Sequence, residues 1–415
     1  MTSVRTLSRS LATVLFCVAV LLFASLASAQ QTQLQAYTAV APATDAAGNA
    51  ISPAQAAANS DLTTFTYSVV SSRDGNTYSG SMVGQDPFGA NFTTTSINTV
   101  VIPVILITNT IAVASPNGKI LTTKPGVAVF DPTAADDACL TSPNDVPLTL
   151  MEQSPIFQPN EFVFGGTPVG DTQYLDAFQR ANFWQFVSGS DYHTMLTPHV
   201  LPPVTVNLPG KQGLAFGFGG CGPLAIVDFD VMLRQVFNKL LVSEGANIDS
   251  SKFPIFLFYN TVMSSSSGDL NHCCILGFHN AVTQNAAVAP NKAARVQTYA
   301  FIDFDTSGAF GPPIKDTTIA AHEVGEWMDD PFGNNPTPAW GHTGQVGACQ
   351  GNLEVGDPLT GTNIPIVTGL NGYAYHLQEL AFFSWFYGAP SIAVNNWFSD
   401  NNTFTTDAGP VCTKH

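Results

Sequence analysis

The stretch Asp316–Pro331, DTTIAAHEVGEWMDDP, decides which fold the sequence predicts. Asp316 and Thr317 are candidates for capping a helix, apolar residues follow them, and Pro331 prevents the helix from continuing. The pattern therefore predicts a short helix from about Asp316 to Met328.

The predicted helix carries His322, Glu323 and Glu326 in the pattern HExxE. Residues 322 and 326 are one turn apart on the same face, so their imidazole and carboxylate converge on one point with Glu323 beside them. Random placement of the eight histidines and seven glutamates of the chain would produce this pattern about 0.002 times. We interpret it as a metal site with an adjacent base. The alternative is an amphipathic surface helix whose acids face the solvent.

A second acidic segment follows at Cys349–Pro358, CQGNLEVGDP. In zincins whose third ligand is a glutamate, that residue comes well after the helix motif, and an aspartate a few positions later orients the histidine ligand. Glu354 and Asp357 match these two positions. The alternative is an ordinary turn with aspartate before proline.

Together, HEVGEWMDDP and LEVGDP resemble the HExxE, (T/D)-(D/N)-P and E(I/V)GD pattern of secreted bacterial proteins and of the plant Exordium-like, phosphate-induced extracellular proteins. The resemblance runs from about Phe253 to the C terminus and does not reach the N-terminal half. It implies a zincin-like metal site of His322, Glu326 and Glu354, with Asp357 as a further candidate ligand, in an extracellular protein.

This ligand set departs from that of a standard HExxH zincin. Two histidines and one glutamate leave a Zn²⁺ centre with one net positive charge, which acidifies its bound water. His322 with Glu326 and Glu354 leaves no net charge, so the water is less acidified. Zn²⁺ is the expected cofactor, and the oxygen ligands also admit Mn²⁺ or Ca²⁺. A di-iron centre would need a second Glu and ExxH set, which the sequence lacks.

The elements before the motif helix are in the order expected of the upper lobe of a zincin: a helix, a small sheet, then the motif helix. The first half of the chain instead has strand patterns separated by turns. The expected fold class is α+β, with a β-rich N-terminal half followed by a zincin-like metallopeptidase-type domain. The patterns are a helix at Asp230–Ser243 and strands at Thr63–Ser71, Thr99–Ala112, Val127–Phe130, Phe253–Asn260, Cys274–Asn280 and Val296–Phe304.

The sequence predicts four regions along the chain. Residues 1–29 form a signal peptide, because Arg5 and Arg9 precede the apolar run Leu11–Leu26 and a small-residue cleavage site. An uncleaved membrane anchor is the alternative. A mobile leader (30–60), a β-rich N-terminal region (61–200) and a zincin-like metal-binding domain (201–415) follow.

Composition and charge restrict the location and the partners of the protein. Only 11% of the 415 residues are charged. Without Arg5 and Arg9, the mature chain has 14 minus 2, or 12, basic residues against 30 acidic ones. Such an acidic chain lacks the cationic surface that nucleic acids require. We expect a secreted protein, extracellular or periplasmic, that binds no nucleic acid and, after signal cleavage, no membrane.

Six cysteines remain after cleavage of the signal peptide, and an even number outside the cytosol indicates disulfides. The sequence does not choose among their pairings. Adjacent Cys273 and Cys274 would point to opposite faces of a strand, so we expect each to bond to a different partner.

The preferred functional hypothesis is a secreted metal-dependent hydrolase, a zincin-like zinc peptidase acting on peptides or proteins. Glu323 would take a proton from metal-bound water while His322, Glu326 and Glu354 hold the metal. The alternative is a non-catalytic extracellular or wall-associated binding protein with a structural metal site. The sequence contains no nucleophile elbow, P-loop or dinucleotide fingerprint. Five further histidines are expected to be structural or surface residues: His193, His199, His272, His279 and His342.

Overall fold

The computed structural model describes residues 37–45, 49–114, 120–135, 140, 145–217, 222–265, 273–284, 294–341, 349–408 and 412. The predicted signal peptide lies outside these ranges, as do Cys139, Cys221, His272 and His342. No helix within these ranges is long and apolar enough to cross a membrane.

One sheet of eleven strands organises the molecule, and seven of its strands close into a barrel. The order around the barrel is β14, β13, β11, β10, β4, β12 and β15, and antiparallel pairing of β15 with β14 closes it. Strand β12 runs parallel to both of its neighbours. The barrel strands are β4 (Thr94–Ala114), β10 (Gly213–Gly217), β11 (Pro223–Asp228), β12 (Phe253–Tyr259), β13 (Thr261–Ser264), β14 (Cys273–Gln284) and β15 (Arg295–Phe304).

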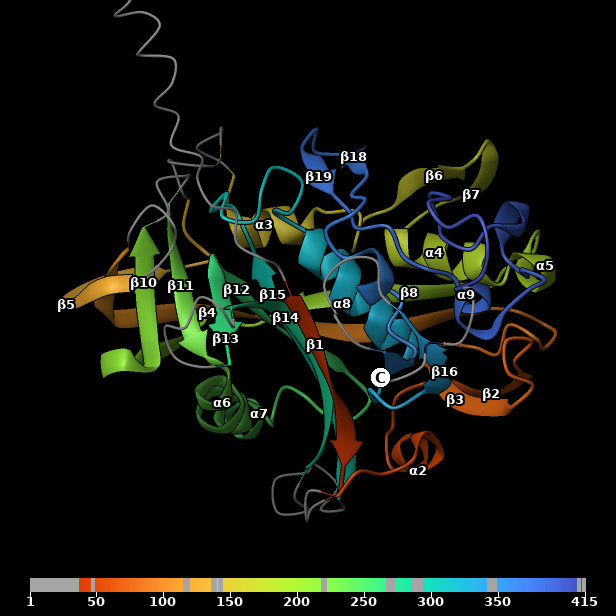
Figure 1. Cartoon of the computed structure of the whole chain (residues 1–415), viewed down its shortest axis with the longest axis horizontal. Helices are drawn as coiled ribbons and strands as arrows, with labels where there is room; N and C mark the ends of the chain where they lie inside the picture. The colour runs from red at the N-terminus through yellow and green to blue at the C-terminus, as the bar shows by residue number, and fades with distance from the viewer. Residues whose placement is uncertain are drawn as a thin grey trace, which may run out of the picture.

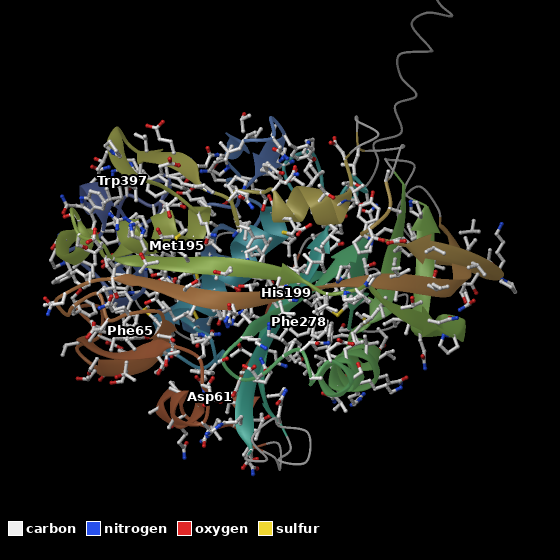
Figure 2. All side chains as sticks on the ribbon, turned by 180° about the vertical axis from the view of Figure 1, so that it is seen from behind. Asp61, Phe65, Met195, His199, Phe278 and Trp397 are labelled. Carbon is white, nitrogen blue, oxygen red and sulfur yellow. A yellow bond between two sulfur atoms is a disulfide. The ribbon has the colours of Figure 1, made fainter. Side chains whose placement is uncertain are left out.

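Strand β4 has 21 residues, rich in the β-branched types that favour strands. Its length allows it to pair beyond the barrel, in parallel with β8 (His193–Val200) and β9 (Val204–Leu208) and antiparallel with β5 (Ile120–Phe130). Strands β4 and β8 lie side by side across the molecule (Figures 1 and 2). At the other end of the sheet, β1 (Tyr37–Thr44) pairs in parallel with β14.

Aromatic side chains fill the barrel interior and pack against a helical segment. This segment comprises α6 (Phe229–Val231), η2 (Met232–Phe237) and α7 (Asn238–Ser243). Successive residues of a strand point to opposite faces, so the neighbours of the interior residues, such as Ile302, point out of the barrel. The ring of Phe237 lies 5.3–6.2 Å, between centroids, from interior rings on β12, β14 and β15: Phe256, Phe258, Phe278, Tyr299 and Phe301.

Helix α8 (Thr318–Asp329), which carries the HExxE motif, packs on the outer face of β14 and β15. It lies in the middle of the molecule, between the barrel strands and α4 (Tyr174–Asn182) (Figure 1). Trp327 stacks on Phe253 of β12 at 3.7 Å between ring centroids, and its indole N–H donates to Thr298 of β15. All 12 residues of α8 are buried, so its acids do not form a solvated face.

Shorter elements complete the described part of the fold. The two-stranded sheets pair β2 (Thr64–Val70) with β3 (Thr77–Val83), β6 (Asn160–Phe164) with β7 (Thr167–Thr172), β16 (Pro336–Trp340) with β17 (Gln350–Asn352), and β18 (Ile366–Thr368) with β19 (Ala374–His376). The other helical elements are α2 (Pro53–Ala58), α3 (Pro147–Glu152), α5 (Trp184–Val187), α9 (Phe383–Tyr387), η1 (Gly210–Gln212), η4 (Asp357–Leu359) and η5 (Val394–Asn396).

The predicted α+β fold with a zincin-like domain is wrong. The described chain is mostly β, with 41% strand and 20% helix, and the motif helix lies on a closed barrel rather than in a helical zincin-like domain. Strands from both predicted halves belong to the same sheet, because β4 pairs with β10 and β12. Local sequence patterns locate strands but do not specify partners that are distant in the sequence.

The segment predicted as a mobile leader contains two regular elements, β1 and α2. Helix α2 begins with a capping box: the Ser52 hydroxyl accepts from the Gln55 backbone N–H, and the Gln55 side chain accepts from the Ser52 backbone N–H. The low apolar periodicity of this segment concealed a strand whose pairing with β14 depends on the rest of the sheet.

Candidate metal centre

Three segments bring ligand-type side chains together. Helix α8 supplies three of them, the segment from the end of β17 to the start of η4 supplies two, and β14, on which α8 packs, supplies one. None is more than 4% exposed. The cluster comprises two imidazoles and four carboxylates, those of His279, His322, Glu323, Glu326, Glu354 and Asp357.

His322, Glu326 and Asp357 form one potential ligand group, with ligand atoms within 4.8 Å of one another. Nε2 of His322 lies 3.0 Å from Oε1 of Glu326 and 3.6 Å from Oδ1 of Asp357, but neither contact has hydrogen-bond geometry. Oε1 of Glu326 accepts the backbone N–H groups of Gly356 and Asp357 at 3.2 and 3.0 Å. Gln350 donates to Oδ2 of Asp357 at 2.7 Å. These bonds hold both carboxylates in place near His322.

His279, Glu323 and Glu326 form a second potential ligand group. Nδ1 of His279 lies 3.5 Å from Oε2 of Glu323 and 3.7 Å from Oε2 of Glu326. Nε2 of His279 is 3.1 Å from the backbone carbonyl oxygen of Asp330. Because a carbonyl oxygen only accepts, Nε2 carries the proton, and Nδ1 presents its lone pair toward the two carboxylates.

Glu354 lies beside the second group and belongs to neither. Its Oε2 is 3.9 Å from Nε2 of His279 and receives no hydrogen bond from the described residues. Its Oε1 accepts from the side-chain amide of Asn352 at 2.8 Å. The sequence predicted His322, Glu326 and Glu354 as ligands, with Asp357 as a further candidate. In the structure Asp357 lies in one group with His322 and Glu326, and Glu354 lies beside His279.

Two glycines allow the backbone to approach the motif side chains closely. A Cβ atom on Gly356 would lie 2.6 Å from Nδ1 of His322, and one on Gly277 of β14 would lie 2.5 Å from Oε1 of Glu323. Both distances are far below ordinary van der Waals contact, so a larger residue would displace the ring or the carboxylate. The two glycines thus enclose the site from the loop and from the strand.

Burial and mutual repulsion dominate the electrostatics of the carboxylates. Burial raises the pKa of Glu323 and of Glu354 far above the ordinary value, and the charge of Glu326 raises both further. Burial also raises the pKa of Glu326, although the opposite charge of His322 counteracts it. A cation within the cluster would relieve the repulsion among these groups.

The two histidines differ in their protonation. Burial lowers the pKa of His279 to about 3, so its ring is neutral. Burial acts in the same direction on His322, but the carboxylates of Glu326 and Asp357 outweigh it and its pKa is raised. Without a metal, His322 is therefore the imidazole that takes up a proton first.

His279 was not among the residues predicted to bind the metal, and it was expected to be a structural or surface residue. The predicted strand Cys274–Asn280 contains this residue, and a histidine within an otherwise apolar strand was the available signal. Which face of the strand packs on α8 depends on the register of the barrel, so periodicity alone did not connect His279 with Glu323.

Other described histidines belong to neither ligand group. His193 pairs with Asp176, and His376 pairs with Asp316, each at 2.7 Å through Nδ1. His199 is exposed on β8 (Figure 2).

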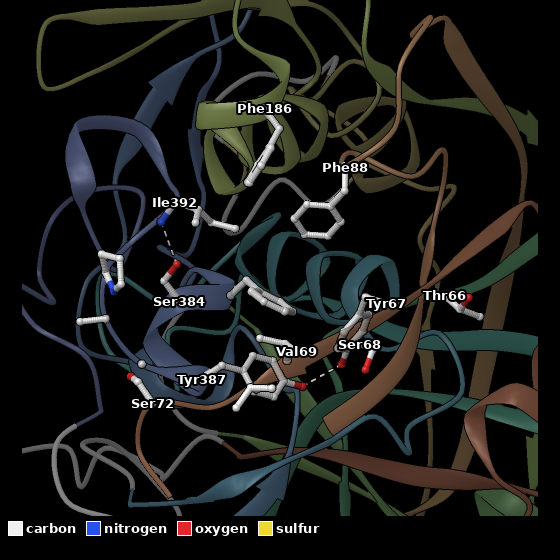
Figure 3. Close-up of a pocket in the computed structure, with 15 residues that line it drawn as sticks. Thr66, Tyr67, Ser68, Val69, Ser72, Phe88, Phe186, Ser384, Tyr387 and Ile392 are labelled. Atoms are coloured by element: carbon white, nitrogen blue, oxygen red, sulfur yellow. Dashed lines mark hydrogen bonds between the residues drawn. The ribbon is translucent and has the colours of Figure 1, made fainter. Parts of the chain in front are cut away.

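A cavity of about 440 Å³ lies beside β2 and α9 (Figure 3). Phe88, Phe186, Tyr67 and Tyr387 contribute to its mostly apolar lining, which includes no histidine, cysteine or acid. The hydroxyls of Tyr67 and Tyr387 hydrogen-bond to each other at 2.7 Å. None of the six ligand-type residues lines this cavity, so it does not give access to the cluster.

Two disulfides occur in the described chain, one joining Cys349 to Cys412 and one joining Cys273 to Cys274. The prediction that Cys273 and Cys274 bond to different partners is wrong. It assumed regular alternation along a strand, but β14 begins at Cys273 and its register against β13 shifts between Cys273 and Ile275.

No family model matches the chain, and neither a curated protein nor a solved structure is significantly similar to it.

Proposed function

We propose that this chain is an extracellular metal-binding protein whose buried cluster holds a divalent metal in a structural role. The observation that carries the proposal is a set of buried polar atoms that have no hydrogen-bond partner among the described residues: Nδ1 of His279, Nε2 of His322 and both carboxylate oxygens of Glu323. Leaving such groups unpaired is costly, and metal coordination would satisfy them. Imidazole and carboxylate ligands suit Zn²⁺ or Mn²⁺.

The burial of the ligand-type residues and the close packing around them support a structural role for the proposed metal. Catalytic metal sites keep one coordination position open to substrate, whereas structural sites have a complete shell of protein ligands. Asp357 lies in the same ligand group as His322. The backbone at Gly277 lies against the Glu323 side chain, and the backbone at Gly356 lies against the His322 ring. The six ligand-type residues are buried, and none of them lines the cavity of Figure 3.

Metal analysis of the purified mature chain tests the proposal. After dialysis against Zn²⁺ or Mn²⁺ and removal of free ions, mass spectrometry of the elements should find bound metal in the wild type. Glu326→Gln, which removes a charge from both ligand groups, should lose it. Glu161→Gln, an exposed change on β6, should retain it. A wild-type chain that binds neither ion would refute the proposal.

One observation favours the hydrolase as a second candidate: Glu323 lies beside His279 and Glu326, and no described side chain donates a hydrogen bond to its carboxylate, which leaves it available to take a proton from metal-bound water. If Glu323 is that base, the metal-loaded wild type should cleave members of a broad peptide library. Glu323→Gln should then abolish cleavage while metal remains bound. A fully loaded wild type that cleaves no peptide would eliminate this candidate.

A further inference from the structure

We propose that the cluster holds two metal ions bridged by Glu326, a dinuclear centre that rests on the metal-binding function proposed above. Glu326 belongs to both ligand groups, whereas His322 and His279 belong to one each. Oε1 of Glu326 faces Nε2 of His322 at 3.0 Å, and Oε2 faces Nδ1 of His279 at 3.7 Å. A carboxylate with an imidazole at each of its oxygens has the arrangement of a bridging ligand.

The position beside His279 has the electrostatics of a second cation site. The lone pair of Nδ1 is directed at carboxylate oxygens of Glu323 and Glu326, so the facing atoms all repel one another. A cation between them would turn this repulsion into coordination. The N–H of Nε2 meets the carbonyl of Asp330, and metal-ligating histidines usually donate their other N–H to such an acceptor.

The net charge of the cluster matches two divalent ions. When ionised, its four carboxylates carry four negative charges, and two neutral imidazoles add none. One divalent ion would balance two of these charges and leave the other two carboxylates protonated, whereas two ions would balance all four. In the described chain, the ion pairs of Glu323, Glu326 and Glu354 involve histidines and no lysine or arginine. A second ion would therefore let the remaining two carboxylates ionise without leaving uncompensated charge inside the protein.

The donor set is that of a known class of dinuclear centres. Di-iron and di-manganese carboxylate proteins use four carboxylates and two histidines, carried on four helices with two ExxH motifs. The sequence lacks the second Glu and ExxH set of such a centre. Here the second imidazole, that of His279, comes from strand β14, and a loop supplies Glu354 and Asp357. Mn²⁺, Fe²⁺ and Zn²⁺ all suit this set of donors.

Counting bound metal tests the inference. The full mature chain, stripped with a chelator and reloaded with Mn²⁺, should carry two ions in native mass spectrometry. His279→Gln and His322→Gln should each lose one of the two equivalents, because each removes a ligand of a different ion. His199→Gln, an exposed change on β8, should retain both.

Electron paramagnetic resonance of the Mn²⁺-loaded wild type gives a second readout, which holds even if the variants do not fold. Ions in two-metal centres lie about 3.5–4 Å apart, so exchange coupling should replace the six-line signal of isolated Mn²⁺. One bound ion with a six-line signal would overturn the dinuclear centre and leave the single-metal proposal standing. Two uncoupled ions would overturn the bridge, and no bound Mn²⁺ or Zn²⁺ would refute both proposals.

Discussion

The backbone of Gly356 lies against the imidazole of His322, so that a Cβ atom on this glycine would be 2.6 Å from Nδ1 of the ring. The same segment donates two backbone hydrogen bonds to Glu326, at Gly356 and Asp357. The loop therefore fixes both the histidine and the glutamate of the HExxE motif, and we expect its close packing to be a condition for the proposed metal binding.

Gly356→Ala should lower both metal content and stability. The added methyl group would displace a fully buried ring, and overpacking of this kind typically costs about 1–3 kcal/mol of unfolding free energy. Gly351→Ala is the matched control in the same segment, because its Cβ would meet only a backbone oxygen at 3.9 Å. Metal analysis and thermal unfolding check the prediction, which fails if the two variants behave alike.

Removing the metal should lower the stability of the wild type and leave the stability of the Glu326→Gln variant unchanged. An ion that binds only the folded chain stabilises it by about 4 kcal/mol when its free concentration is 1,000 times the dissociation constant. Adding a chelator should therefore lower the melting temperature of the wild type in calorimetry. Equal melting temperatures with and without chelator would show that no stabilising metal is bound.

The buried carboxyl group of Asp305 should make the free energy of unfolding fall as the pH rises. Burial raises its pKa to about 7, so the folded chain binds a proton that the unfolded chain releases near pH 4. The stabilising contribution of protonated Asp305 to the free energy of unfolding is complete below the pKa that Asp305 has in the unfolded chain. It is lost as the pH rises through about 7, by up to about 1.4 kcal/mol per pH unit. Asp305→Asn should flatten this dependence in denaturant unfolding between pH 5 and pH 8.

The wild type and the variant should be compared at the same metal content, because the ligand cluster contributes its own pH dependence equally to both. Asp191→Asn, an exposed change, is the control and should keep the slope of the wild type. A slope that Asp305→Asn does not alter would contradict the assignment to Asp305.

The disulfide between Cys349 and Cys412 should stabilise the segment that carries Glu354 and Asp357, because it closes a loop with a sequence separation of 63. Cys412→Ser should lower the unfolding free energy by about 2–4 kcal/mol. Cys349→Ser should have the same effect, and the double variant should add nothing further, since each change removes the same bond. Additive losses in urea unfolding would argue against this pairing, as would alkylation of both cysteines without reduction.

The sequence by itself determined the local part of the site. Helical spacing places His322, Glu323 and Glu326 together wherever α8 lies, because residues one turn apart share a face. The segment LEVGDP supplied Asp357, which the structure brings to His322, and Glu354, which lies beside His279. These predictions needed only short-range geometry and the chemistry of the side chains.

Only the tertiary structure decided the barrel, the burial of α8 and the contribution of His279. Strand patterns revealed β4, β12, β14 and β15, but their closure into a ring depends on pairings between segments far apart in the chain. The register of β14 against β15 determines that His279 lies near Glu323, and no periodicity within either segment encodes that register. A site shared between a helix and a strand that are distant in sequence is therefore visible only once the chain is folded.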